Sequence, residues 1–288
     1  MLSVAKVAPE GRSLSRPCHR LLLFDGMFLV GRNVMSKYNS GRATVFVGDR
    51  FTNRYGCEAE VIKYESAKKV TIRFLDDFCY ELTTAVSTLR NINFKNPYHP
   101  TVCGVGYLGH GKHLAKVKGK DTAVYQRWTG MIARCYASRP GYYETYIGCT
   151  MVPEWLNFQT FAEWHSKQPF LDGMQIDKDI LLKNNRTYSP ENCRLVPTEI
   201  NKAMTGGKKN RDSDLPTGVG ICGKKFSANI TTSGKHRYLG LYSTPEEAFS
   251  VYKLEKELHI RQLAEKYKDA LVPEIYEAMM NWEVLITD

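Results

Sequence analysis

The residues best suited to chemistry lie between Met174 and Asn201, in the stretch MQIDKDILLKNNRTYSPENCRLVPTEIN. Asp177 is a carboxylate at the end of an expected strand, and Asn201 is an amide on a short expected helix that begins at Pro197. Mg²⁺ prefers such oxygen ligands and needs only one or two from the protein, because it keeps several of its waters. The stretch therefore predicts one Mg²⁺ or Mn²⁺ ion held by Asp177 and Asn201, in a site able to act on a phosphodiester.

Local elements must hold these two ligands in place. The apolar run before Asp177 predicts a strand, and the polar residues after it predict a hairpin loop. Asn192, in the sequence SPEN, is expected to clamp the backbone of this loop through its side chain. Upstream, residues 123–136 have helical periodicity, and a second helix is expected at 155–165 with its aromatic residues in the core.

This stretch resembles the HNH endonuclease family, whose ββα-metal fold has two strands, an Asn-containing loop and a helix. It is most similar to the phage homing-endonuclease branch, typified by LDRID…GNYSPENCRW…N, where this chain has IDKD…NNRTYSPENCRLVPTEIN. WTGMIARCY and VPEWLNFQTFAEW match further segments of that branch. The resemblance implies that Asp177 is the metal-binding acid, Asn192 the central structural Asn and Asn201 the second metal ligand.

Lys178 occupies the position of the family's general-base histidine. A lysine beside a cation stays protonated, and it can take a proton from water at neutral pH only if burial brings its pKa to about 7. Lys178 could instead hold the phosphate as a catalytic residue, and His165 is an alternative base. Both an active nuclease and a catalytically inactive derivative therefore remain open.

The carboxy-terminal region predicts a second compact unit. Strands are expected at 218–222, 225–232 and 235–242, and a strongly capped helix follows from Ser243. The sequences GVGIC, KFSANI and SGKHRYLGLYSTPEEAFSVY resemble the integrase-type (AP2) DNA-binding domain, which lays a three-stranded sheet in the major groove.

Within this sheet, period-two alternation places Phe226, Ala228 and Ile230 against the helix. The opposite face and the adjoining hairpin are expected to contact DNA, together with the basic linker before the sheet. The residues concerned are Lys225, Ser227, Asn229, Thr231, Lys235, Arg237 and Tyr238, with Lys208, Lys209 and Arg211 in the linker.

The region before residue 100 predicts binding rather than catalysis. Short alternating runs at 58–65, 68–76 and 78–82 are typical of antiparallel strands and favour a small barrel of SH3 or Tudor type. A protein partner is a reasonable expectation for such a barrel. Residues 1–45 are rich in arginine and form a basic amino-terminal segment.

Charge indicates a polyanionic partner. The 288 residues carry a net charge of +10, but residues 246–288 hold ten acids against five Lys or Arg, a balance of −5 that leaves +15 for residues 1–245. Double-stranded DNA is the partner that this distribution favours. No run approaches the ~18–20 apolar residues of a membrane span, so a cytoplasmic protein is expected.

Other chemistries find less support. The eight cysteines are scattered without a CxxC pair, which favours reduced structural thiols; a zinc site from Cys135, Cys149 and Cys193 is a weaker alternative. The glycine-rich loop at 103–120 has neither GKS nor GKT, so no nucleotide cofactor is expected.

These observations predict an α+β multidomain protein. The expected layout is a basic segment (1–45), an SH3-like barrel (46–100), an HNH-like ββα-metal core with flanking helices (101–205), a basic linker (206–214), an AP2-like sheet and helix (215–260) and a helical tail (261–288). The function expected is a metal-dependent, DNA-targeted endonuclease. Its alternatives are an inactive DNA-binding regulator and a virion or host-interaction protein.

Overall fold

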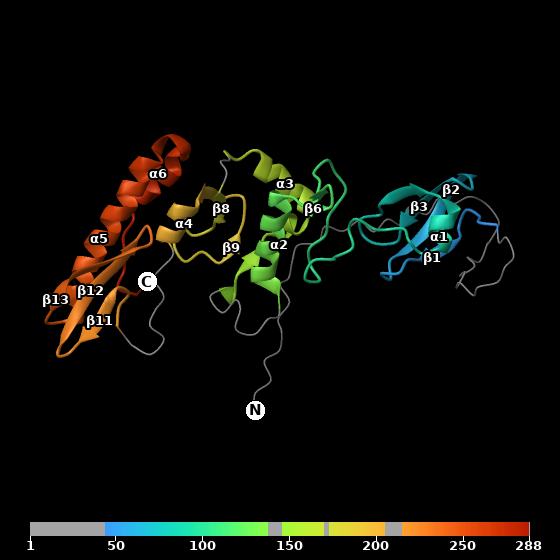
Figure 1. Ribbon diagram of the computed structural model, residues 1–288. Coiled ribbons are helices and arrows are strands. Elements are labelled where there is room, and N and C mark those ends of the chain that lie inside the picture. The colour runs from blue at the N-terminus through green and yellow to red at the C-terminus, as the bar shows by residue number, and fades with distance from the viewer. Residues whose placement is uncertain (1–43, 138–145, 170–172, 205–214, 288) are drawn as a thin grey trace, which may run out of the picture. The chain divides into compact units, whose positions relative to one another are not determined.

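The computed structural model describes residues 44–137, 146–169, 173–204 and 215–287. The protein is mixed α+β and divides into two compact units, Met1–His99 and Pro100–Asp288 (Figure 1). Most of the expected basic segment 1–45 and all of the linker 206–214 lie outside the described residues. No helix within the described ranges is both long and apolar enough to cross a lipid bilayer.

The first unit contains an antiparallel sheet in the order β1-β2-β3-β4. Alternate residues of β2 and β3 are buried, as the period-two pattern predicts, and they pack with Leu89 and Phe94. The elements are β1 (Arg50–Thr52), β2 (Glu58–Ser66), β3 (Lys69–Phe74), β4 (Glu81–Thr84) and the helix α1 (Val86–Arg90).

The closed barrel expected for this unit is not found among its described residues. β1 pairs with β2 and β4 pairs with β3, but no ladder joins β1 to β4. Because β1 has three residues and β4 has four, neither edge offers a long ladder for closure. The alternation predicted the strands, whereas closure depends on pairing between strands far apart in the sequence.

The first part of the second unit is built on aromatic residues. Trp128, Trp155, Phe158 and Phe161 are buried in one cluster, and Trp128 Nε1 donates to the Trp155 carbonyl at 2.7 Å. The helix expected at 155–165 is divided into a 3-10 turn and α3. The elements are β5 (Lys116–Val117), β6 (Lys120–Asp121), α2 (Ala123–Tyr136), β7 (Thr150–Met151), η2 (Pro153–Leu156) and α3 (Phe158–Ser166).

A small strand–loop–strand–helix unit follows. β8 (Met174–Asp177) pairs antiparallel with β10 (Arg194–Pro197), and α4 (Thr198–Met204) begins directly after β10. β9 (Thr187–Tyr188), in the loop between them, pairs in parallel with β7. The strand, the loop and the helix agree with the sequence pattern for this stretch, except that Pro197 ends β10 and the helix begins one residue later, at Thr198.

The carboxy-terminal sheet has the order β11-β12-β13 and is covered by the long helix α5 (Figure 1). Thr244 begins α5 with a capping box completed by Glu247. The elements are β11 (Val219–Cys222), β12 (Lys225–Thr232), β13 (Lys235–Tyr242), α5 (Pro245–Lys266), η3 (Lys268–Ala270) and α6 (Pro273–Met280).

α5 joins two cores. Its first half packs Phe249 and Tyr252 against Ile230 of the sheet. Its second half packs Ile260 and other apolar side chains into a cluster that includes Ile200 of α4. The helix continues through residue 260, where a domain boundary was expected, so the sheet and the strand–loop–helix unit share one continuous support.

Candidate metal centre and nucleic-acid interface

Asp177 ends β8 and caps the loop that follows it. Its Oδ1 accepts hydrogen bonds from the backbone N–H groups of Asp179 at 2.8 Å and Ile180 at 2.7 Å. The residue is 8% exposed, and this burial raises the pKa of the carboxyl group, although the two N–H donors oppose the rise. One oxygen therefore shapes the loop, and the second is the one that could serve a metal ion.

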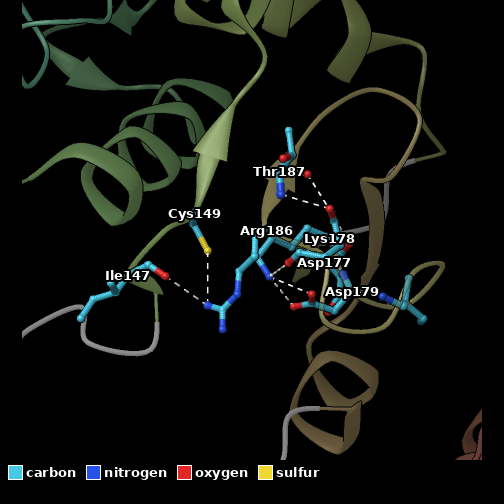
Figure 2. A network of polar contacts seen from close by, with 9 residues as sticks. Ile147, Cys149, Asp177, Lys178, Asp179, Arg186 and Thr187 are labelled. Atoms are coloured by element: carbon cyan, nitrogen blue, oxygen red, sulfur yellow. Dashed lines mark hydrogen bonds and ion pairs between the residues drawn. The ribbon is translucent and has the colours of Figure 1, made fainter. Parts of the chain in front are cut away.

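Lys178 is enclosed by hydrogen-bond acceptors, as Figure 2 shows. Its Nζ donates to both carboxylate oxygens of Asp179, at 2.8 and 2.6 Å, and to the Asn185 carbonyl at 2.6 Å. It also lies 6.0 Å from the centre of the Tyr188 ring. These contacts connect Lys178 to both sides of the loop that follows β8, so its side chain holds the loop.

Asn185 makes the loop clamp that the sequence pattern predicts for Asn192. The Asn185 Nδ2 donates to the Lys178 carbonyl at 2.9 Å and to the Thr187 carbonyl at 2.7 Å, and its Oδ1 accepts from Thr187 N–H at 3.0 Å. For Asn192 the contact seen is a backbone one, from its N–H to Ser189 Oγ at 3.3 Å. The adjacent pair Asn184-Asn185 in a polar loop was the sequence signal that could have indicated this clamp.

Asn201 and Gln175 lie together. The Asn201 Nδ2 donates to Gln175 Oε1 at 2.7 Å, and Gln175 lies on the same face of β8 as Asp177 because side chains alternate along a strand. Gln175 was not singled out from the sequence. The structure thus brings two amides together, one of them two residues before Asp177 on the same face of β8.

These oxygen donors fit a hard divalent cation. Mg²⁺ accepts carboxylate and amide oxygens and completes its shell with water. Among the residues that the structure describes, no group of three His, Cys, Asp or Glu side chains is placed to hold a metal ion. The candidate centre therefore offers one carboxylate and two amide oxygens. The residues that would hold the ion are Asp177, Asn201 and Gln175.

The zinc alternative gains no support from the buried thiols. Burial raises the pKa of Cys135 to about 11 and that of Cys193 to about 12, so both thiols hold their protons at neutral pH, whereas zinc binds the thiolate. Within the described ranges, Cys149 does not complete a three-ligand group with them.

His165 lies on α3 beside Phe161, with ring centres 6.0 Å apart. Burial and the charge of Arg127 lower the pKa of His165 to about 4. Arg127 itself donates to the carbonyl of Met174 at 2.8 Å. Because Met174 begins β8 and Asp177 ends it, these contacts connect His165 to the beginning of the strand. The candidate ligand Asp177 lies at the other end.

The carboxy-terminal sheet has one face against α5 and one open face. Ala228 and Ile230 are buried, as predicted, while Phe226 is partly buried. In register, Tyr238 lies opposite Asn229 and belongs with it to the open face, where Tyr238 is 59% exposed. The open face of β12 also carries Lys225, Ser227 and Thr231.

Two residues predicted to add DNA contacts do not belong to the open face. Arg237 lies opposite Ile230, and its Nη2 donates to Glu255 of α5 at 2.6 Å; Lys235, opposite Thr232, has the same parity. Both therefore lie on the helix side or its margin. Lys208, Lys209 and Arg211 lie outside the described residues.

Comparison with protein-family models, curated proteins and solved structures finds no match to this chain. A function for this chain is therefore inferred from the residues of the site and their geometry.

Proposed function

We propose that this protein is a metal-dependent DNA endonuclease of HNH type, directed to double-stranded DNA by its carboxy-terminal sheet. The observation that supports the proposal is the 2.7 Å hydrogen bond between Asn201 and Gln175. It brings Asn201 of α4 next to Gln175, which lies on the same face of β8 as Asp177. A metal ion shared by Asp177 and Asn201 would need both residues on that face.

When bound, one Mg²⁺ or Mn²⁺ ion would act as a Lewis acid on the scissile phosphodiester. Asp177 would contribute the carboxylate oxygen that does not cap the loop, and Asn201 would contribute its amide oxygen. Lys178 would fix the loop through Asp179 and Asn185. Because a general base commonly contributes about 10²- to 10⁴-fold to a rate, an enzyme with Lys178 at this position is expected to cleave slowly.

The proposal extends to the rest of the chain. The carboxy-terminal sheet would supply the contacts that select a DNA site, and the first unit, with its four-stranded sheet, would bind a protein partner. A protein with this function would act in the cytoplasm of the cell that contains its DNA substrate. It requires no nucleotide cofactor.

One observation favours a second function. The three hydrogen bonds of Lys178 leave the family's base position occupied by a side chain that holds structure. A catalytically inactive regulator, which binds DNA through the same surfaces, would have the same arrangement. The two functions differ in one measurable property, the metal-dependent breakage of a phosphodiester.

The direct test is nicking of supercoiled DNA, including DNA from the source of the protein, in Mg²⁺ and then in Mn²⁺. Asp177→Asn is the informative variant because an amide oxygen can still accept the N–H groups of Asp179 and Ile180 while the ligand charge is lost. Asn201→Ala removes the second ligand. Both variants are expected to keep the unfolding temperature of the wild type and to lose nicking.

Asp179→Asn is the matched control, since it makes the same chemical change two residues further on, at a side chain 44% exposed. It is expected to retain most of the nicking rate. Tight DNA binding without cleavage in either metal would exclude the endonuclease and leave the regulator. Cleavage that survives Asp177→Asn would show that the metal centre has been placed on the wrong residues.

A further inference from the structure

Arg134 is a cation in an unusual environment. Its Nε atom is buried and has no hydrogen-bond partner among the described residues. Its guanidinium carbon lies 5.5 Å from the centres of two aromatic rings, those of Tyr146 and Tyr188. By contrast, Arg194 and Arg237 are paired with the carboxylates of Glu274 and Glu255. Buried polar groups without a partner are rare and call for an explanation.

The position of Arg134 connects it to the candidate metal centre. Arg127, seven residues earlier and so on the same face of α2, contacts Met174 at the beginning of β8. Seven residues of helix rise about 10 Å, and the three residues from Met174 to Asp177 also advance about 10 Å. At the other end of this stretch, the charge of Lys178 acts to lower the pKa of Cys135, the residue after Arg134, so Arg134 is expected to be level with the end of β8.

Tyr188 provides a second, independent connection. The same ring that lies beside the Arg134 guanidinium also lies 6.0 Å from Lys178 Nζ. Lys178 directly follows Asp177, and its ammonium group is already occupied by Asp179 and Asn185. Of the two cations on this ring, Arg134 is thus the one whose hydrogen-bonding capacity is still available.

We propose that Arg134 binds a backbone phosphate of the DNA next to the scissile bond. The two tyrosine rings hold the guanidinium by cation–π contact without using its N–H donors. A guanidinium held in this way can donate two parallel hydrogen bonds to phosphate oxygens. The inference rests on the proposed function, because it names the phosphodiester of that same substrate as the missing partner.

The alternative is that Arg134 only packs against the two rings, and the two roles predict opposite effects on stability. Arg134 is partly buried and has no anionic partner among the described residues, and replacing such a cation by an apolar residue of similar size is often neutral or stabilising. Arg134→Met is therefore expected to keep or raise the unfolding temperature and to weaken DNA binding about five- to tenfold at moderate salt. A packing residue would lower the unfolding temperature and leave binding unchanged.

The experiment measures binding of a short DNA duplex over a series of salt concentrations, with Ca²⁺ present so that no strand is cut, beside nicking in Mg²⁺. Loss of one phosphate contact should reduce the slope of log K against log salt by about 0.9. Arg134→Lys, which keeps the charge without the planar fork, should retain the slope and lose affinity. Lys167→Met is the charge-matched control, since Lys167 is an exposed residue directly after α3 that is paired with Glu163 of that helix.

Each outcome separates this inference from the proposed function. Nicking by the wild type with an unchanged salt slope in Arg134→Met overturns the phosphate contact and leaves the endonuclease intact. Binding without nicking, but with the slope reduced by Arg134→Met, supports the contact and overturns catalysis. If Lys167→Met loses as much affinity and salt slope as Arg134→Met, the effect is one of general charge and the specific phosphate contact is overturned. Absence of DNA binding overturns both proposals.

Discussion

Asn185→Ala is the substitution whose effect can be worked out most directly from the structure. The side chain is 9% exposed and makes three hydrogen bonds of 2.7 to 3.0 Å with the backbone of Lys178 and Thr187. Alanine would leave two carbonyls and one N–H without their partner. At about 1 kcal/mol for each such group, we expect the free energy of unfolding to fall by about 3 kcal/mol.

The assay is urea unfolding followed by tryptophan fluorescence. Trp128, Trp155, Trp164 and Trp282 are the tryptophans of the chain, and all belong to the second unit, so the signal reports on the unit that contains Asn185. With a denaturant dependence of about 1–3 kcal/mol per M of urea, the midpoint should fall by about 1–3 M.

Asn192→Ala is the matched control, because it makes the same chemical change in the same loop. The contact described for Asn192 is made by its backbone N–H, which alanine retains, so a loss below about 1 kcal/mol is expected. A larger effect for Asn192→Ala than for Asn185→Ala would refute the assignment of the clamp to Asn185.

Three further outcomes are expected. Because Arg127 and burial lower the pKa of His165 to about 4, below about pH 6.5 the unfolded chain binds a proton that the folded chain does not. Stability should therefore fall between pH 6.5 and 4, by about 2 kcal/mol between pH 7.5 and 5 for a fully buried group. Because His165 is only partly buried, solvent screening lowers this change to about 1 kcal/mol. His165→Gln should remove it in urea titrations at the two pH values; an equal fall in the wild type and the variant would contradict the shift. Ile200→Ala, at a side chain with 0% exposure, should cost about 3 kcal/mol of unfolding free energy in the same assay, and a cost under about 1 kcal/mol would disprove its place in the core shared with α5. Tyr238→Ala should weaken duplex binding about five- to tenfold in fluorescence anisotropy. Arg237→Met should change the affinity by less than about twofold, because Arg237 is paired with Glu255 of α5. A larger loss for Arg237→Met than for Tyr238→Ala would show that the faces of the sheet are misassigned.

Most of the local elements could be predicted from the sequence. The alternation in β2 and β3 is a property of neighbouring residues, and the structure shows the same alternation in burial. The start of α5 could also be predicted, since Thr244, Pro245 and Glu247 are residue types that commonly begin helices. Such signals extend over a few residues, and they act before any tertiary contact is made.

The candidate site was predictable only in part. Residue type and order placed Asp177 at a strand end and Asn201 on the following helix, and the structure has them there. The alternation could not indicate that Arg237 would face α5, because a register shift at Ala228/Asn229 changes which residues of β13 oppose β12.

The sequence by itself determined the strands, the helices and the residue types available near residue 177. Only the tertiary structure decided which amide clamps the loop, whether the first sheet closes and which cation on Tyr188 has a buried nitrogen without a hydrogen-bond partner among the described residues. The physical reason is that periodicity and capping depend on residues a few positions apart. The partner of a buried polar group, in contrast, is set by backbone segments that meet only after the chain has folded.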